Sequence, residues 1–253
     1  MELVVLGSGT FAPEGRTGEA VRRPAGYALR LKGRLILFDL GFGNLHQLAR
    51  AGLDAQEVGH AFFTHRHPDH VGDLAALLFL FHYSDKPRSG ALRLYGPRGF
   101  AGFLARLQRA HYPWLKPRGF RLEVQELEEK QIVRGDGWAV RCREVPHSTE
   151  SLAYRFDSKF GSFCYTGDTG PDAGLAKFAQ GVDCFVLECS LSDRKKNENH
   201  LQVSQALALF KASGAKKGLL SHLSPDSSTE AARKIRRFPG VRLAEDLMRL
   251  KIG

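Results

Sequence analysis

The sequence predicts an α+β protein in which two mixed β-sheets are covered by outer helices. Short apolar runs rich in β-branched and aromatic residues recur along the chain, and segments with helical periodicity lie between some of them in both halves. Strands and helices do not alternate strictly. Two sheets with helices on their outer faces therefore fit the pattern better than a single parallel sheet.

The length and composition favour one domain over residues 1–253. Of the 253 residues, 43% are hydrophobic, so the chain can bury a substantial core. This length permits either one large domain or two small ones. No stretch has the composition of a linker, and we therefore expect a single domain.

The expected strands are the short apolar runs bounded by turn-forming residues. They are Glu2–Leu6, Tyr27–Leu31, Leu35–Asp39, Ala61–Thr64, Leu92–Tyr95, Arg121–Gln125, Ala139–Val145, Leu152–Phe156, Phe163–Thr166, Cys184–Leu187 and Gly218–Ser221. The expected helices are Asn44–Ala51, Asp73–Tyr83, Phe100–Ala110, Gln202–Ala212 and Ser228–Arg236. Gly52 follows the first of these helices at the position where a glycine commonly ends a helix.

The cysteines and the first residues of the chain predict a cytoplasmic protein that is not in a membrane. Cys142, Cys164, Cys184 and Cys189 form no C-x-x-C pair, and three of them lie in apolar runs, as buried free thiols do. The apolar run that follows Met1 is too short for a signal peptide. No stretch approaches the roughly 20 apolar residues that a membrane-spanning helix needs.

The formal net charge of +10 favours an anionic substrate or partner, such as a phosphate compound or a nucleic acid. Charge governs association rather than fold. Taken by itself, a solvated basic surface is the simpler interpretation of this charge.

The segment Thr64–His70 carries the strongest local signal, because it places four potential metal ligands directly after an apolar run: His65, His67, Asp69 and His70. The first two histidines are two residues apart, so in an extended chain both rings point the same way, whereas Pro68 turns the chain and lets the other two ligands face a second ion. Imidazole and carboxylate suit zinc or another divalent first-row metal. Alternatively, Asp69 caps a helix that begins near Val71, and the histidines merely decorate a loop.

Three further candidates follow strand-like runs: His147, Asp168 and His222. Ligands at the ends of strands can converge on one edge of a sheet. Singly, each has a local alternative, since a lone histidine is usually satisfied nearby and Asp168 could be a turn residue. Together with the first segment they supply the six or seven ligands that a dinuclear hydrolytic site needs. Asp39 and Gly41 are expected to form a turn near this site.

These residues make the sequence resemble the metallo-β-lactamase superfamily, whose His-x-His-x-Asp-His signature corresponds to His65–His70 and is followed in order by the three further candidates. The resemblance spans nearly the whole chain and implies a four-layer αββα sandwich. Within the superfamily the sequence is most similar to the ribonuclease Z branch. The segments that carry this similarity are Leu6–Thr10, Leu37–Gly41, Tyr95–Pro97, Tyr165–Thr169, His200-Leu201, Ser221–Pro225 and Ala244–Asp246.

The resemblance implies two divalent metal ions, with zinc expected and manganese or iron as alternatives. It assigns one ion to His65, His67 and His147. It assigns the other ion to Asp69, His70 and His222, with Asp168 bridging the two. Both ions then polarise one water molecule, and Asp69 beside that water is expected to orient it or to accept its proton.

His200 matches an additional histidine of the ribonuclease Z branch and is the candidate for protonating the leaving oxygen or binding the scissile phosphate. Its alternative role is to cap the helix that starts near Gln202. Asp226 stands where the branch often has a basic residue. The basic run Arg194–Lys196 is a candidate to supply that positive charge, but no substrate-binding residue is assigned.

We therefore expect a metal-dependent hydrolase, a ribonuclease Z-like phosphodiesterase that acts on a nucleotide, an RNA or another phosphodiester. The fold and the metal centre do not determine the substrate, so a thioester, lactone or sulfate ester hydrolase is an alternative. A second alternative is a non-catalytic RNA-binding protein whose metals only stabilise the fold.

The resemblance carries two further implications. Members of the branch that process tRNA have a long tRNA-gripping arm between the ligands that correspond to His147 and Asp168. Here these residues are 21 positions apart, and two predicted strands occupy the interval, so no separate arm fits. The resemblance also implies a homodimer. The apolar stretch Leu74–Phe81 is a candidate contributor, although a buried core helix explains it better.

Overall fold

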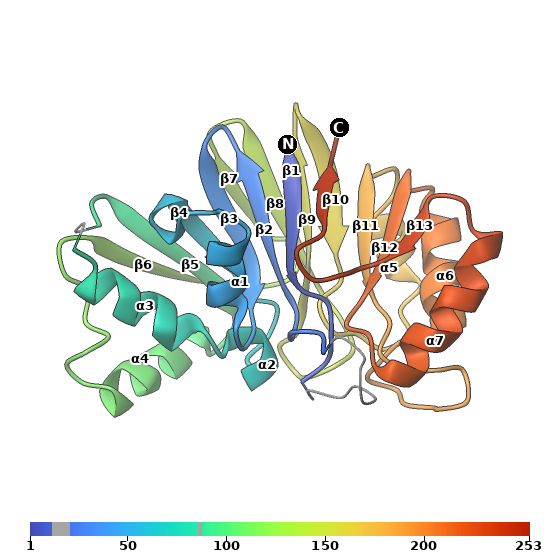
Figure 1. Ribbon diagram of the computed structural model, residues 1–253, viewed down its shortest axis with the longest axis horizontal. Helices are drawn as coiled ribbons and strands as arrows, with labels where there is room; N and C mark the ends of the chain where they lie inside the picture. The colour runs from blue at the N-terminus through green and yellow to red at the C-terminus, as the bar shows by residue number, and fades with distance from the viewer. Residues whose placement is uncertain (12–20, 86–87) are drawn as a thin grey trace.

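Two sheets that face each other form the centre of the molecule. The computed structural model describes residues 1–11, 21–85 and 88–253, and in these residues two seven-stranded sheets are present (Figure 1). The first sheet has the order β14-β1-β2-β3-β4-β5-β6. Its strands are β1 (Glu2–Gly7), β2 (Gly26–Leu31), β3 (Arg34–Leu40), β4 (Val58–Phe62), β5 (Ala91–Pro97), β6 (Arg121–Leu127) and β14 (Arg249–Lys251).

The second sheet has the order β13-β12-β11-β10-β9-β8-β7. Its strands are β7 (Ile132–Gly135), β8 (Trp138–Glu144), β9 (Leu152–Ser158), β10 (Gly161–Tyr165), β11 (Cys184–Glu188), β12 (Lys217–Ser221) and β13 (Val241–Leu243). Both sheets are mixed. The strands from β14 to β3 and from β7 to β10 pair antiparallel, and the rest pair parallel.

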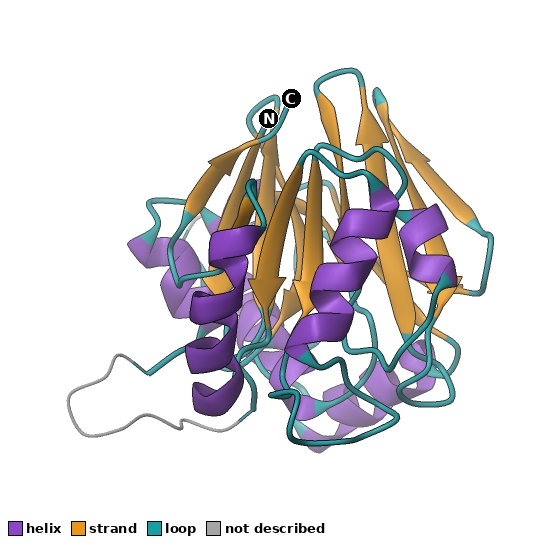
Figure 2. Ribbon diagram, turned by 90° about the vertical axis from the view of Figure 1, so that its right-hand side faces the viewer, coloured by secondary structure: helices purple, strands orange, loops and turns teal. Residues whose placement is uncertain are grey.

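Helices cover the outer faces of the two sheets (Figure 2). The first sheet carries α1 (Asn44–Arg50), α3 (Leu74–Tyr83) and α4 (Phe100–Ala110), and the second carries α5 (Gly174–Phe178), α6 (Val203–Ser213) and α7 (Pro225–Lys234). The short helix α2 (Pro68–Val71) lies between β4 and α3 in the chain and contacts β3, and the 3-10 turns are Ala55–Glu57 and Ile235–Arg237. Among the described residues, no helix has the length and apolar character needed to cross a membrane.

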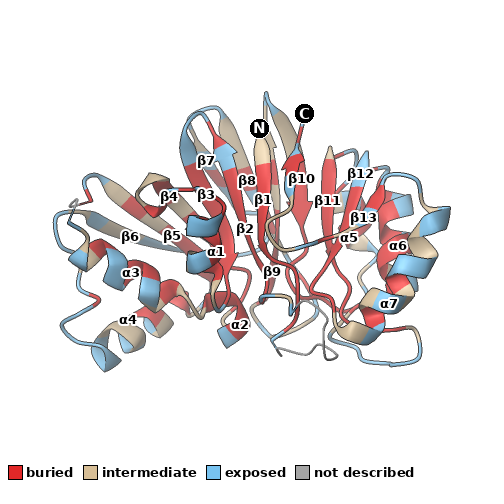
Figure 3. Cartoon of the chain, in the orientation of Figure 1, coloured by how far each residue is buried: buried red, intermediate tan, exposed pale blue. Residues whose placement is uncertain are grey.

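Hydrophobic clusters fill the spaces between the layers. The central cluster lies between the sheets and contains aromatic side chains of both, such as Phe38 and Phe62 from the first sheet and Phe163 from the second. Separate clusters join each sheet to its own helices. Figure 3 shows buried residues along the strands and on the sheet-facing sides of the helices, with the exposed residues outside. The predicted four-layer αββα sandwich is thereby confirmed.

The predicted elements are all present, with shifts at their ends. The last predicted helix, Ser228–Arg236, is α7 and begins earlier, at Pro225, where Ser224 caps it. The strands β7, β13 and β14 and the helices α2 and α5 were not predicted, because three to five residues are too few for a hydrophobic period to show. Gly52 has a φ of 67° directly after α1, as expected for a glycine that ends a helix.

The apolar stretch of α3 is mainly a core segment. Leu74, Leu77, Leu78 and Phe81 are buried against the first sheet, which agrees with the favoured interpretation of this stretch. The interval between His147 and Asp168 is occupied by the hairpin of β9 and β10, as predicted, and no arm extends from it.

Candidate metal centre

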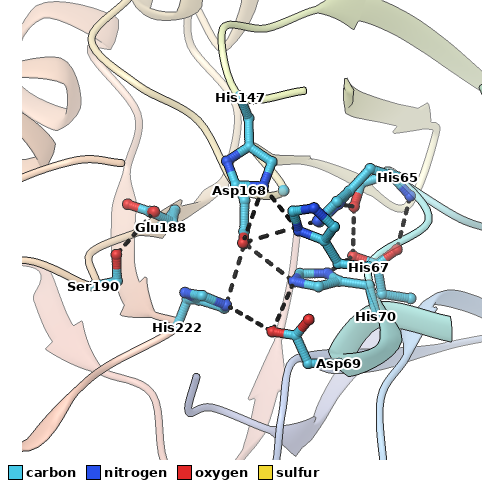
Figure 4. A network of polar contacts seen from close by, with 12 residues as sticks. His65, His67, Asp69, His70, His147, Asp168, Glu188, Ser190 and His222 are labelled. Atoms are coloured by element: carbon cyan, nitrogen blue, oxygen red, sulfur yellow. Dashed lines mark hydrogen bonds and ion pairs between the residues drawn. The ribbon is translucent and has the colours of Figure 1, made fainter. Parts of the chain in front are cut away.

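The predicted ligands converge at the carboxyl ends of strands from both sheets. His65 and His67 follow β4, and Asp168 and His222 follow β10 and β12. Parallel strands end at the same edge of a sheet, so residues far apart in the sequence meet there. Figure 4 shows His147, Asp69 and His70 joining them around Asp168. All seven predicted ligands are thus brought together.

A first group of ligand atoms surrounds one oxygen of Asp168. Its members are His65, His67, His147 and Asp168, whose ligand atoms all lie within 4.8 Å of one another. Oδ2 of Asp168 is 4.0 Å from Nε2 of His65 and 3.8 Å from Nε2 of His147. Nε2 of His147 is 3.2 Å from Nδ1 of His67. Three histidines and one carboxylate oxygen therefore enclose one point.

A second group faces the other oxygen of Asp168. Its members are Asp69, His70, Asp168 and His222. Oδ1 of Asp168 is 3.2 Å from Nε2 of His70 and 3.3 Å from Nε2 of His222. Oδ2 of Asp69 is 3.7 Å from the same nitrogen of His70 and 3.6 Å from that of His222. The two oxygens of one carboxylate thus belong to two neighbouring groups.

These groups fit divalent metal ions on two counts. Ligand atoms about 2.0–2.2 Å from a tetrahedral zinc ion lie roughly 3.3 Å apart, close to the shorter separations here. Among the described residues, Nε2 of His65, Nε2 of His70, Oδ1 of Asp168 and both ring nitrogens of His222 are buried without a hydrogen-bond partner. Buried polar atoms normally have partners, so these atoms fit an ion as their partner.

The buried groups of the centre shift one another's pKa values. Burial and the neighbouring His70 hold the pKa of His65 well below its usual value. Burial acts to lower the pKa of His70 as well, but Asp168 and Asp39 outweigh it and hold that pKa well above its usual value. Burial acts to raise the pKa of Asp168, but His222 and His70 outweigh it and hold that pKa well below the usual range. The neighbouring histidines therefore favour the ionised form of this carboxylate.

Comparison with known proteins shows which family has this arrangement. Residues 34–223 match the family described as the beta-lactamase superfamily domain. The chain belongs to this superfamily. It is 26% identical over 309 aligned residues to the ribonuclease Z of Methanothermobacter thermautotrophicus, with coverage of 100% of this chain and 97% of that protein.

Solved structures share the fold. The metallo-beta-lactamase fold protein YhfI from Bacillus subtilis superposes with a TM-score of 0.81 at 20% identity, covering 98% of each chain. The short form of human tRNase Z superposes with a TM-score of 0.79 at 25% identity, covering all of both chains. The fold and the ribonuclease Z-like character that the sequence predicts are thus confirmed.

Backbone and side-chain acceptors orient the histidines of this superfamily centre. Nδ1 of His147 donates to the carbonyl oxygen of Asn199 at 2.9 Å. Nδ1 of His65 lies 3.0 Å from the hydroxyl of Thr64, which itself donates to Asp39. With their Nδ1 atoms bonded outward, both rings direct Nε2 toward Asp168, and such outer partners fix the tautomer of metal-binding histidines.

Asp39 is the main positioning residue of the centre. It lies buried at the end of β3, and its Oδ2 accepts hydrogen bonds from Nδ1 of His70 at 2.7 Å and from the hydroxyl of Tyr165 at 2.8 Å. Its Oδ1 accepts from the amide N–H of Thr64 at 2.7 Å. Sequence reasoning placed Asp39 in a turn near the site and missed this role. The sequence signal for this positioning role is an acidic residue at the end of an apolar run, where its side chain is buried.

We expect Asp39→Asn to lower metal affinity by about 10- to 100-fold, as is typical when an outer partner of a metal-binding histidine is lost. The amide would turn a donor toward groups that already donate. Metal affinity is measured by competition with a chromogenic chelator. Tyr165→Phe is the matched control, because it removes one donor to Asp39 but leaves the contact with His70; equal affinity loss in both variants would contradict a specific role for that contact.

Two residues of the centre have left-handed backbone conformations. The φ angle is 55° for both Asp39 and His222, at the ends of β3 and β12. For residues other than glycine this region is sparsely populated and costs on the order of 1–3 kcal/mol. Such strain gathers at functional sites, where neighbouring structure holds a side chain in a required direction.

His200 is paired with a buried carboxylate rather than with a helix end. Nδ1 of His200 contacts Oε1 of Glu188, and the other carboxylate oxygen of Glu188 accepts from the N–H of Leu201 at 2.8 Å. Burial acts to lower the pKa of His200, but the contact with Glu188 outweighs it, and the pKa is raised. Glu188 ends β11 and was not predicted as a site residue, although it too is an acid that ends an apolar run.

Both capping alternatives from the sequence are wrong. The helix α2 begins at Pro68, and Asp69 lies inside its first turn without capping it. The helix α6 has Gln202 as its N-cap, whose N–H is bonded by the side chain of Gln205, so His200 is not needed there.

A cavity of about 580 Å³ opens over the centre. Asp69, Asp168, His200 and His222 lie in its wall. Lys195, from the predicted basic run, also lines it, and its Nζ is 3.0 Å from Oδ2 of Asp226. Asp226 therefore forms an ion pair with Lys195, a member of the basic run that was expected to supply the positive charge missing at position 226.

Proposed function

We propose that the chain, folded as one domain over residues 1–253, is a metal-dependent phosphodiesterase that hydrolyses nucleotide or RNA phosphodiesters at a dinuclear site. The observation that carries the proposal is Asp168, whose two oxygens face two separate groups of ligand atoms, several of which are buried without a hydrogen-bond partner. The similarity to proteins named ribonuclease Z and tRNase Z supports a phosphodiester substrate. Divalent metal binding follows from the fold and the clusters; two zinc ions are our specific proposal.

In the proposed assignment the ligands hold the ions, Asp69 also acts on the water, and His200 is a further group outside the ligand set. When bound, the ions supply positive charge for the phosphoryl oxygens and a water of lowered pKa. Asp69, within 3.7 Å of ring nitrogens of His70 and His222, is placed to accept a proton from the attacking water. His200 lies on the wall of the same cavity, its pKa is raised by Glu188 against the effect of burial, and it would protonate the leaving oxygen.

Metal analysis and a substrate panel test the proposal. We expect about two ions per chain, loss of activity on chelation, and recovery with zinc or manganese. We also expect hydrolysis of bis(p-nitrophenyl) phosphate, cyclic nucleotides or short RNA in preference to thioesters, lactones and aryl sulfates. The same panel includes pre-tRNA, to test whether the protein cleaves it although the β9–β10 hairpin occupies the interval where a tRNA-gripping arm would lie.

Two outcomes would contradict this function. Efficient turnover of a thioester, lactone or sulfate ester without phosphodiester cleavage would reassign the substrate. RNA binding with steep salt dependence and without any cleavage by metal-replete protein would favour a binding protein with structural metals.

A further inference from the structure

Two phenylalanine rings stand exposed on the wall of the catalytic cavity. Phe11 is 71% exposed and Phe42 is 47% exposed, and both line the cavity that also contains Asp168 and His222. Large apolar side chains are usually buried, and no aromatic contact involves either ring among the described residues. Their exposure beside the reacting groups calls for an occupant.

The backbone around Phe42 holds its ring in place. Phe42 follows β3 and packs against Gly72 at the end of α2, where a Cβ atom would lie 2.3 Å from Cδ1 of the ring. Gly41 permits a similarly close approach, because a Cβ there would lie 2.2 Å from the carbonyl oxygen of Asp69. One face of the ring therefore rests on the helix that carries Asp69, and the ring reaches the cavity.

The segment before Phe11 is tied by hydrogen bonds to other parts of the chain near the metal centre. The carbonyl oxygen of Ser8 accepts from the N–H of Leu223 at 2.9 Å, directly after the ligand His222. The N–H and hydroxyl of Ser8 both donate to Oδ1 of Asp246, at 3.0 and 2.8 Å. The strand end that leads to Phe11 is therefore tied to the segment that carries a metal ligand.

We propose that Phe11 and Phe42 form a base-binding subsite, which stacks a nucleobase attached next to the phosphodiester at the metal centre. The subsite rests on the proposed phosphodiesterase function and specifies its substrates as nucleotides. Aromatic side chains stack any base through its π-face, so the subsite selects for a base without reading its sequence.

The first test compares two esters with the same leaving group. Thymidine 5′-(p-nitrophenyl phosphate) carries a base, and methyl p-nitrophenyl phosphate does not. We expect wild type to prefer the thymidine ester in kcat/KM by roughly 5- to 150-fold, the range that stacking of one base supplies. Phe42→Leu and Phe11→Leu, which keep an apolar side chain, are each expected to reduce this ratio about 10-fold, and Phe42→Tyr is expected to retain it.

The matched control is Phe79→Leu. Phe79 is also 47% exposed, but it lies on α3 outside the cavity, so the ratio is expected to stay at the wild-type value. An unchanged ratio in both Phe42→Leu and Phe11→Leu would overturn the subsite. An equal loss with both esters would also overturn it, because the rings would then serve the leaving group that the esters share.

A binding measurement separates the subsite from the proposed function. Calorimetric titration of zinc-loaded protein compares AMP with ribose 5-phosphate, which has the same phosphate and sugar but no base. Tighter binding of AMP that Phe42→Leu abolishes would support the subsite even if no phosphodiester were hydrolysed. Hydrolysis of both esters at equal kcat/KM, with equal binding of both phosphates, would leave the phosphodiesterase standing and refute the subsite.

Discussion

Replacing Asp168 by asparagine is expected to remove bound metal and hydrolytic activity together. The two oxygens of Asp168 lie within 3.2–4.0 Å of nitrogens of His65, His70, His147 and His222. An asparagine has the same shape, but it carries no negative charge and offers one amide nitrogen that cannot bind a cation. One substitution therefore damages both groups of ligands.

The expected fall in kcat/KM is roughly 10³-fold or more, because bound metal ions stabilise transition states of this kind by several kcal/mol. Metal content is measured on the same preparation by elemental analysis. Asp172→Asn is the control, since Asp172 pairs with Arg143 at 2.9 Å and belongs to neither ligand group.

His67→Ala tests the same centre with little risk of unfolding, because His67 is exposed whereas Asp168 is buried. We expect this variant to lose metal and activity together while its thermal unfolding midpoint, measured with metal-free protein, stays close to that of wild type. Full metal content and full turnover in both Asp168→Asn and His67→Ala would refute the dinuclear assignment.

Replacing His200 by alanine is expected to lower phosphodiesterase turnover by roughly 10²- to 10⁴-fold, the range for a general acid or base, while metal content stays at the wild-type value. The ring of His200 lies 4.8 Å from that of His147, so it is close to the reacting groups. Loss of metal from this variant would make His200 a ligand, since Glu188, His200 and His222 also form a cluster that could hold an ion.

The contribution of Glu188 is measured by a double-mutant cycle. Glu188 contacts His200 and has no direct place in the two groups around Asp168, so Glu188→Gln is expected to act through His200. Residues that act as a unit give strongly non-additive losses. The substitution should therefore slow wild type but change His200→Ala very little. Additive losses would contradict the pairing, and His111→Ala, at an exposed histidine, serves as the control.

The length of the interval between His147 and Asp168 was enough to predict that it contains a hairpin and no tRNA-gripping arm. An interval of 21 positions holds two strands and a turn and nothing more. The β9–β10 hairpin occupies it, as predicted. The interval therefore holds no separate substrate-binding arm, and the exposed rings of Phe11 and Phe42 on the cavity wall are our proposed contacts for the substrate.

The sequence by itself determined the class of the fold and predicted the candidate ligand set that the structure brings together. His65, His67, Asp69 and His70 lie in one short segment, so their relative positions follow from local backbone geometry. The strands and helices of the core could be located because burial on one face leaves a periodic pattern. The short elements α2, α5, β13 and β14 leave no such pattern.

Only the tertiary structure decided which residues support those ligands and what surrounds them. Asp39 meets His70, and Glu188 meets His200, through contacts between separate strands and loops, and a single acidic residue at a strand end does not reveal its partner. Phe11 and Phe42 belong to different segments that line one cavity in the folded chain, where Leu223 pairs with Ser8 and the ring of Phe42 packs on Gly72. Contacts of this kind depend on packing across the whole fold, and they cannot be predicted from the local sequence.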